Sequence, residues 1–525
     1  MTGKLTGNRR GFLRKAGTLA AGAAMAGPYQ GLLASGNGWE KRRPDNTCGY
    51  GELVDAMDCT TGQMLLRLPK GFEYRTFGAA GSLMDDGQIT PPFHDGMMLF
   101  RHRSGRGRHK RPTWRLVRNH ETRFQLGNGG GLAGSPQPAS GEVGTNPYDE
   151  VCNGGTTTIE VCPDGDDWGD VRSWRSSSGT YFNCSGGNTS YRTWITCEEL
   201  NGGPDLGGGP FGGDFFGNGT NLTQKHGYIY EVDSRWGPGE NPVPEPITHA
   251  GRFTHEGAVM DPQTGYLYMT QDDFFGPSGL YRYIPPKGNN PRKDRKLHDG
   301  GTLQMLRVVG LPQAELYNTQ APGSVYDVDW VTIPDPDPTF SSDNWLASLG
   351  AVAAQGIDQG AAQFSRLEGI RRRGQRIFFT STQGGQGREG ASSTFGPGFG
   401  QVWKLNLRKM RLRLVYEVPP PATGDVGPDG NLPALNLPDN IAISPRGTLA
   451  ICEDGTIDDP PFVINSNFLK GLTRDGKLFE FAENIVDDGE FAGVTFSPDL
   501  TRMFFNVQTT GLTYEVRGPF HKGPF

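Results

Sequence analysis

The sequence predicts an all-β fold, a six-bladed β-propeller with long Gly/Pro-rich loop insertions, from its composition and from a repeated two-strand segment. Glycine contributes 79 and proline 39 of the 525 residues, and both residue types are costly inside helices. Aromatic residues make up 10% of the chain, which argues against a disordered chain. A large, loop-rich β protein remains, and repetition around an axis allows such a chain to form one domain.

A two-strand segment with a turn between its strands recurs along the chain. Its clearest copy has Glu256-Gly257 at the start of the first strand and Asp272-Asp273 at the end of the second. The six copies span residues 95–121, 185–199, 256–273, 368–382, 439–454 and 492–508. Their spacing exceeds the roughly 40 to 45 residues of a bare blade, so stretches such as 202–219 are expected to be surface loops. An array of immunoglobulin-like sandwiches is the alternative, but its units would be more even in length.

The repeat would also bring acidic residues together. Equivalent blade positions gather around a propeller axis, so Asp95, Glu256, Glu368 and Asp439 would converge there. The ends of the second strands would add Glu121, Cys197, Glu198, Glu199, Asp272, Asp273 and Glu453. Carboxylates this crowded cannot all stay ionised without cations. One such acid alone is more simply a turn cap on the solvated rim, but recurrence at one register position favours a metal centre.

The first residues are typical of an export signal. Arg9 and Arg10 precede Phe12, Leu13 and a weakly apolar, alanine- and glycine-rich stretch, which matches a twin-arginine leader. We expect residues 1–34 to be this signal and residues 35–525 to be one propeller domain with its metal centre in the central channel. The apolar stretch is too short to span a bilayer as a stable helix, so no membrane span is expected.

Charge and export together restrict the expected partners. The formal net charge is -6, which argues against a dedicated nucleic-acid partner. We expect a monomer that uses the twin-arginine export machinery and works in the periplasm or outside the cell.

The cysteines leave alternatives open. There are seven, and in an oxidising compartment an odd number leaves at least one without an intramolecular partner. Cys152 is close enough in sequence to pair with Cys162 or Cys184. From the residues alone, Cys197 is best interpreted as a buried structural thiol or as half of a disulfide with Cys184.

Several motifs carry a resemblance to a known family. They include Trp-Ile-Thr-Cys-Glu-Glu at 194–199, Thr-His-Glu-Gly at 254–257, Pro-Asp-Asn at 438–440 and Asn-His-Glu at 119–121. In this order they resemble the PhoX family of secreted alkaline phosphatases, over essentially the whole chain after the leader. That resemblance implies a propeller whose centre holds two ferric irons and several calcium ions, with a cysteine thiolate shared between the irons.

The resemblance also implies roles for individual residues. Cys197 would be the iron thiolate, Glu256 and Glu368 would be iron carboxylates, and Arg366 would grip the substrate phosphate. Weaker matches would be calcium ligands or groups that support ligands: Glu121, Glu198, Glu199, Asp272, Asp273 and Glu453. Leu367 stands where the family pattern has proline, which could shift the Arg366 backbone.

We therefore expect a metal-dependent phosphomonoesterase that releases inorganic phosphate from small phosphate esters. The dianionic phosphoryl group needs positive charge at its non-bridging oxygens, which cations would supply and which Arg366 could augment through two parallel hydrogen bonds. Two alternatives remain. One is a calcium-dependent lactonase-type hydrolase, in which Cys197 would be incidental, and the other is a non-catalytic propeller that binds a partner through its loops.

Overall fold

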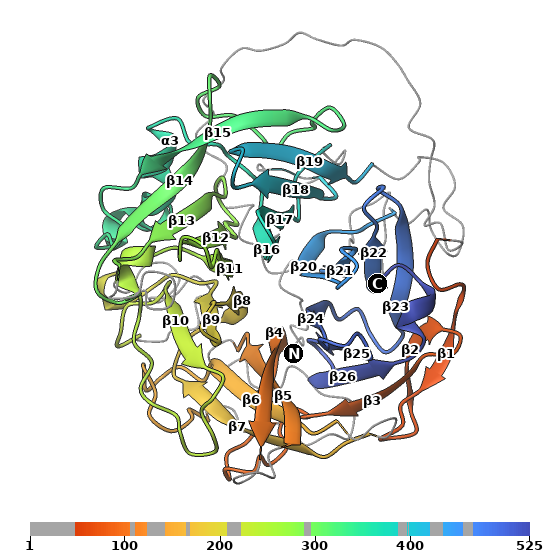
Figure 1. The fold of residues 1–525 in the computed structure, drawn as a ribbon. Coiled ribbons are helices and arrows are strands. Elements are labelled where there is room, and N and C mark those ends of the chain that lie inside the picture. The colour runs from red at the N-terminus through yellow and green to blue at the C-terminus, as the bar shows by residue number, and fades with distance from the viewer. Residues whose placement is uncertain are drawn as a thin grey trace, which may run out of the picture.

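The computed structural model describes residues 48–104, 111–122, 142–163, 168–206, 222–287, 296–386, 396, 398–419, 434–454 and 466–525. The predicted signal peptide, residues 1–34, lies outside these ranges. Antiparallel sheets stand around a common centre and form a propeller-like ring (Figure 1). The predicted all-β class is confirmed.

The ring can be followed in chain order. Its first sheet contains β4 (His94–Ser104), β5 (Arg111–His120), β6 (Gly155–Val161) and β7 (Val171–Ser178). The next contains β8 (Asn183–Asn188), β9 (Thr193–Glu198) and β10 (Ile229–Asp233).

A nine-stranded sheet follows, in which β15 (Val325–Thr332) joins two groups of four strands. One group is β11 (His255–Met260), β12 (Leu267–Gln271), β13 (Leu280–Ile284) and β14 (Thr302–Val308). The other is β16 (Leu367–Arg373), β17 (Arg376–Ser381), β18 (Gln401–Asn406) and β19 (Arg411–Glu417).

Two sheets that mix both ends of the described chain complete the ring. In one, β1 (Leu53–Met57) and β2 (Met64–Pro69) extend β20 (Pro438–Ile443), β21 (Leu449–Glu453), β22 (Phe468–Leu472) and β23 (Leu478–Asn484). In the other, β3 (Glu73–Phe77) is added to β24 (Phe491–Phe496), β25 (Arg502–Val507) and β26 (Leu512–Arg517). Pairing of β3 with β26 joins the two ends of the described chain.

Within the described ranges, six strands line the centre of the ring. β4 contacts β8, and the contacts continue through β11, β16, β20 and β24, which contacts β4 again. These are the first strands of the six predicted segments, and each pairs with the second strand of its own segment. The prediction that these segments occupy equivalent places is confirmed.

Each inner strand contains an irregularity near its start. The register shifts between the first and fourth residues in five of them and one residue later in β24. A β-bulge of this kind re-aims side chains. The third residue is glycine in four of the six strands, because the backbone of the next strand leaves no room for a side chain. A Cβ on Gly369 would lie 2.5 Å from the Asp439 carbonyl oxygen, and one on Gly96 would lie 2.5 Å from the Ser185 Cα.

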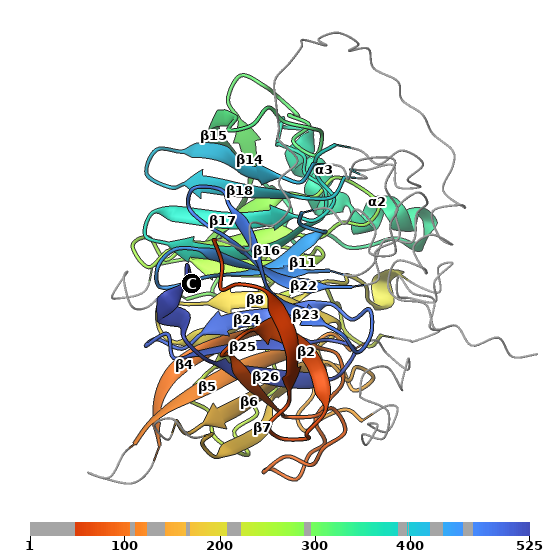
Figure 2. The same ribbon diagram turned by 90° about the vertical axis from the view of Figure 1, so that its right-hand side faces the viewer.

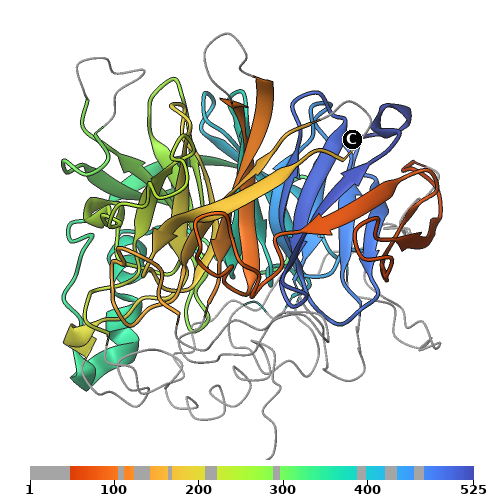
Figure 3. The same cartoon turned by 90° about the horizontal axis from the view of Figure 1, so that it is seen from below.

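Helices are short and lie apart from the inner strands. α2 (Trp345–Leu349) and α3 (Ala351–Ile357) lie at one face of the ring. Figures 2 and 3, two views of the ring from its side, show this position. The 3-10 turns are η2 (Pro204–Leu206), η3 (Thr248–Ala250), η4 (Ser342–Asn344) and η5 (Phe520–Lys522). No helix in the described ranges is long and apolar enough to cross a membrane.

Candidate metal centre and active site

Each inner strand presents its second residue at the centre of the ring. In chain order these residues are Asp95, Cys184, Glu256, Glu368, Asp439 and Ala492. The first five are buried, and neighbours along this series have ligand atoms within 4.8 Å of one another in three overlapping groups. The bulges and the ring closure thus convert a sequence repeat into a cluster of potential metal ligands.

The second strands contribute the residue that follows their last paired position. β5 ends at His120 and is followed by Glu121, β9 by Glu199, and β21 by Asp454. Glu490, just before β24, completes the set. We call Asp95, Glu121, Cys184, Glu199, Glu256, Glu368, Asp439, Asp454 and Glu490 the carboxylate arc.

Burial and mutual repulsion disfavour ionisation within the carboxylate arc. Burial first, and then the neighbouring carboxylates Glu368 and Glu256, raise the pKa of Asp439 well above its usual range. Burial first, and then the neighbouring carboxylate Asp454, also raise the pKa of Glu490 well above its usual range. Cations would remove this penalty, because an opposite charge within a few ångströms favours the charged carboxylate.

The cysteine of the carboxylate arc is Cys184. Its Sγ donates to Glu199 Oε2 at 2.6 Å, and it belongs to two groups, one with Asp95 and Glu121 and one with Glu199 and Glu256. The arc therefore has a sulfur-containing part and a part made only of carboxylates.

Arg366 is the cation at the all-carboxylate part. Its guanidinium donates to both oxygens of Asp272, at 3.0 and 2.6 Å, and Nη2 lies 2.7 Å from Glu368 Oε1. Its backbone is left-handed, with φ of 46°. The residue before the inner strand also has a positive φ in β4, β8 and β20, at Phe93, Phe182 and Leu437. The left-handed conformation of Arg366 is therefore a feature of the repeat and is not caused by Leu367.

Cys197, predicted to be the iron thiolate, lies in the hydrophobic core instead. It packs in a cluster with Ile195, Phe253 and Met269, and burial raises the pKa of its thiol well above the usual range. Among the described residues, the groups that could hold a metal do not include it. Cys452 precedes Glu453 on β21 as Cys197 precedes Glu198 on β9, and it is also a core residue.

Glu198 and Glu453, predicted to be calcium ligands or groups that support ligands, face protein groups. Glu198 accepts from His226 Nδ1 at 2.7 Å and from the amides of Tyr181, Gly227 and Tyr228. Glu453 pairs with Lys470 at 2.9 Å and accepts from two backbone amides. In the pairs Glu198-Glu199 and Glu453-Asp454, the second residue belongs to the carboxylate arc.

Asp272 and Asp273, also predicted to be calcium ligands or groups that support ligands, have different surroundings. Asp272 is the partner of Arg366. Asp273 accepts from the amides of Phe275 and Gly276 at 2.9 and 2.8 Å and so closes a turn. Burial raises the pKa of Asp273 to about 6.

Cys184, Asp454 and Glu490 are the members that sequence reasoning missed. The third residue of β8 is Ser185, whereas the equivalent residues of β4, β11 and β16 are glycines. On sequence alone, Ser185-Gly186 aligns with the acid–glycine pairs of the other segments. This alignment places the segment one residue too late, because Cys184 is the second residue of β8. Counting back from the acidic pair at the end of β9 would have found Cys184, since it lies beside Asn183, the partner of Glu198.

Comparison with protein families decides the identity. The model of the family described as alkaline phosphatase PhoX matches residues 48–176 and 168–511. This chain belongs to the PhoX family. It is a metal-dependent phosphomonoesterase, so neither the lactonase nor the non-catalytic alternative is needed.

A solved structure of the family has the same fold. The PhoX of Pseudomonas fluorescens, solved with vanadate as a transition-state analogue, is 18% identical, with a TM-score of 0.63 over 91% of this chain and 99% of that one. The gluconolactonase XC5397 of Xanthomonas campestris is more distant, at 11% identity and a TM-score of 0.36 over 90% of this chain and 98% of that one. A comparison with curated proteins finds no match.

Proposed function

We propose that this PhoX family member hydrolyses small phosphate esters at the carboxylate arc, with iron at its sulfur-containing part and calcium at its all-carboxylate part. The observation that carries this proposal is the position of Cys184, whose Sγ lies within 4.8 Å of ligand oxygens on both sides. A thiolate favours a transition metal, whereas a set of carboxylates favours calcium.

The donor set fits these ions. Cys184 is shared by two neighbouring groups of the arc, which suits a sulfur shared between two irons. Glu256, Glu368 and Asp439 form a group of oxygens alone, as do Asp439, Asp454 and Glu490. Cys184, not Cys197, is therefore the thiolate that we assign to iron, with Glu256 as a carboxylate ligand beside it.

The bound cations would supply positive charge to the non-bridging oxygens of the phosphoryl group. Arg366 would bind those oxygens from the side of Glu368, and Asp272 holds its guanidinium in place through two hydrogen bonds. A planar guanidinium that is already fixed loses little freedom when it binds a phosphate. Gln508 donates to Asp95 at 3.0 Å and would orient a ligand at the other end of the arc.

Location outside the cytoplasm remains part of the proposal. The arginine pair at 9–10 and the apolar stretch after it support export by the twin-arginine route, and this route would carry the chain already folded. A reporter that is exported only when Arg9 and Arg10 are intact would test this part separately.

Two alanine variants test the assignment of the thiolate. Cys184→Ala is expected to lose its iron, measured by elemental analysis, and with it the turnover of p-nitrophenyl phosphate. Cys197→Ala should keep both, because its Sγ contacts the apolar core. Loss of iron from Cys197→Ala with normal iron in Cys184→Ala would overturn the assignment.

A further inference from the structure

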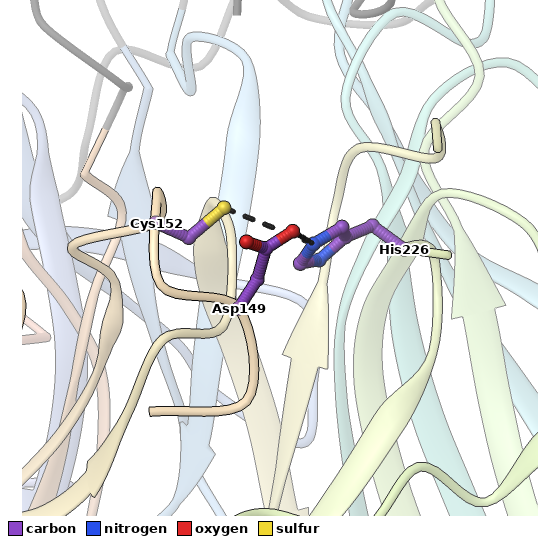
Figure 4. A group of neighbouring side chains, drawn as sticks. All are labelled: Asp149, Cys152 and His226. Carbon is purple, nitrogen blue, oxygen red and sulfur yellow. Dashed lines mark hydrogen bonds and ion pairs between the residues drawn. The ribbon is translucent and has the colours of Figure 1, made fainter. Parts of the chain in front are cut away.

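A second group of potential metal ligands lies away from the carboxylate arc. Asp149, Cys152 and His226 are buried, and their ligand atoms lie within 4.8 Å of one another. Figure 4 shows the three side chains directed toward a common point, Asp149 and Cys152 from one loop and His226 from another. None of the three belongs to the carboxylate arc.

The spacing of the donor atoms suits a tetrahedral ion. Bond lengths of about 2.05 Å to nitrogen, 2.1 Å to oxygen and 2.3 Å to sulfur give tetrahedral N–O and N–S edges of about 3.4 and 3.6 Å. His226 Nε2 lies 3.2 Å from Asp149 Oδ2 and 3.7 Å from Cys152 Sγ. An ion could therefore bind all three with small adjustments.

The remaining nitrogen of His226 has the partner that a metal ligand usually has. Nδ1 lies 2.7 Å from Glu198 Oε1, and this carboxylate is held by three backbone amides. A carboxylate at Nδ1 fixes the tautomer that leaves Nε2 available to a metal and raises its basicity. Glu198 would therefore support a ligand, as the family resemblance allows, but at a site outside the carboxylate arc.

Asp149 is also positioned before any ion binds. It accepts from the amides of Val151, Thr223 and Gln224 at 3.1, 2.8 and 3.0 Å. Tyr148 and Tyr181 pack their rings edge-on against the imidazole, with centroids 5.4 and 5.8 Å away. These contacts hold the loop that follows β5 against the segment that leads into β10.

We propose that Asp149, Cys152 and His226 bind one Zn²⁺, which fastens residues 149–152 to the segment that leads into β10. A carboxylate, an imidazole and a thiolate together suit zinc, and three protein ligands leave a fourth position for water. All three ligands are buried and lie outside the carboxylate arc, so this ion would hold two segments together rather than take part in phosphate ester hydrolysis. Binding releases the thiol proton of Cys152 and the Nε2 proton if His226 carries one.

The experiment uses the full-length exported protein, loaded with ZnCl₂ and freed of excess metal. Elemental analysis should give one zinc per chain in addition to the metals of the carboxylate arc. Cys152→Ser should lose this zinc and keep its iron, whereas Cys184→Ala, the matched control, should lose iron and keep the zinc. Glu198→Gln should weaken zinc binding by roughly 10- to 100-fold, measured by competition with a chelator.

A measurement on the unaltered protein covers the case in which Cys152→Ser does not fold. X-ray absorption at the zinc edge should show one sulfur near 2.3 Å together with nitrogen and oxygen neighbours. Zinc content that is the same in Cys152→Ser, or a zinc edge without sulfur, would overturn the proposal. Such results would indicate that the cluster holds no metal and is an ion-paired group in which a protonated His226 lies between Glu198 and Asp149.

Discussion

Arg366 is the residue that we propose binds the phosphate. It lies among acids, with Asp272, Glu368 and Asp454 all within 3.5 Å, and Phe274 stacks over its guanidinium at 4.9 Å. A lysine could supply the charge but not the two parallel hydrogen bonds to Asp272. Its geometry, more than its charge, therefore makes arginine necessary at this position.

Arg366→Lys is expected to lower kcat/KM for p-nitrophenyl phosphate by roughly 10- to 100-fold, since one charge-assisted hydrogen bond contributes about 1.5 to 3 kcal/mol. Steady-state kinetics and phosphate inhibition would measure the effect. Arg373→Lys is the matched control, because Arg373 is exposed at the far end of β16. Equal losses in both variants would contradict a specific role for Arg366.

Glu453 is expected to stabilise the fold rather than bind a metal. Its pair with Lys470 is buried on both sides, with side-chain exposures of 1% and 2%. Lys470→Met should lower stability by about 3 to 5 kcal/mol, because it leaves a buried carboxylate without its partner. Thermal unfolding would measure this, with the exposed Lys409 changed to Met as control. Unchanged stability of Lys470→Met would contradict this structural role of Glu453.

At the scale of single elements, the bulged start of the inner strands is the repeated device. It places the second residue of each strand at the centre and lets adjacent strands approach closely at the third. The approach is tight because the contacting atoms belong to backbone, which cannot rotate aside. The glycines of the repeat therefore permit the close strand contacts that bring the proposed metal ligands together.

Gly369→Ala tests this dependence. The new methyl group would meet the Asp439 carbonyl oxygen at 2.5 Å and the Ile441 amide nitrogen at 2.7 Å, so β16 and β20 must separate. We expect a loss of about 1 to 3 kcal/mol of stability and reduced metal content, measured by thermal unfolding and elemental analysis. Gly350→Ala is the control, since the nearest atom to its added Cβ is 3.8 Å away; equal effects in the two variants would argue against the steric explanation.

At the scale of the whole molecule, we expect metal binding and folding to be coupled through the closed ring. The ring forces buried carboxylates together, and β3 and β26 close it from opposite ends of the described chain. Burial, with Asp272 and Asp454 nearby, raises the pKa of Glu368 from 4.5 to about 7. Each unit of such a shift corresponds to about 1.4 kcal/mol.

Removal of the metals should therefore make stability depend on pH. The pKa of Glu368 is higher in the folded protein. Between pH 4.5 and about 7, the metal-free folded state therefore keeps a proton on Glu368, whereas the unfolded chain has already lost it. Stability must then fall as pH rises through that window, and Asp439 and Glu490 act in the same direction. Thermal unfolding of EDTA-treated protein should show this decrease, whereas metal-loaded protein should not. A metal-free protein that is equally stable at pH 5 and pH 8 would contradict the coupling.

Much of the architecture could be predicted because a short sequence pattern recurs in each two-strand segment. The turn between each pair of strands and the acid–glycine step at 256–257 and 368–369 recur along the chain. The prediction was wrong in register at 183–187, where Ser185 replaces the expected glycine. A shift of one residue moves every side chain of a strand to its other face.

The sequence by itself determined the all-β class, the repeated segments and the convergence of Asp95, Glu256, Glu368 and Asp439, because glycine content and side-chain order act locally. Tertiary structure decided which residue of each acidic pair faces the centre, that Cys184 rather than Cys197 lies among the carboxylates, and that His226 meets Asp149 and Cys152. The physical reason is that bulge register and ring closure set side-chain direction, and both depend on contacts between segments far apart in the chain.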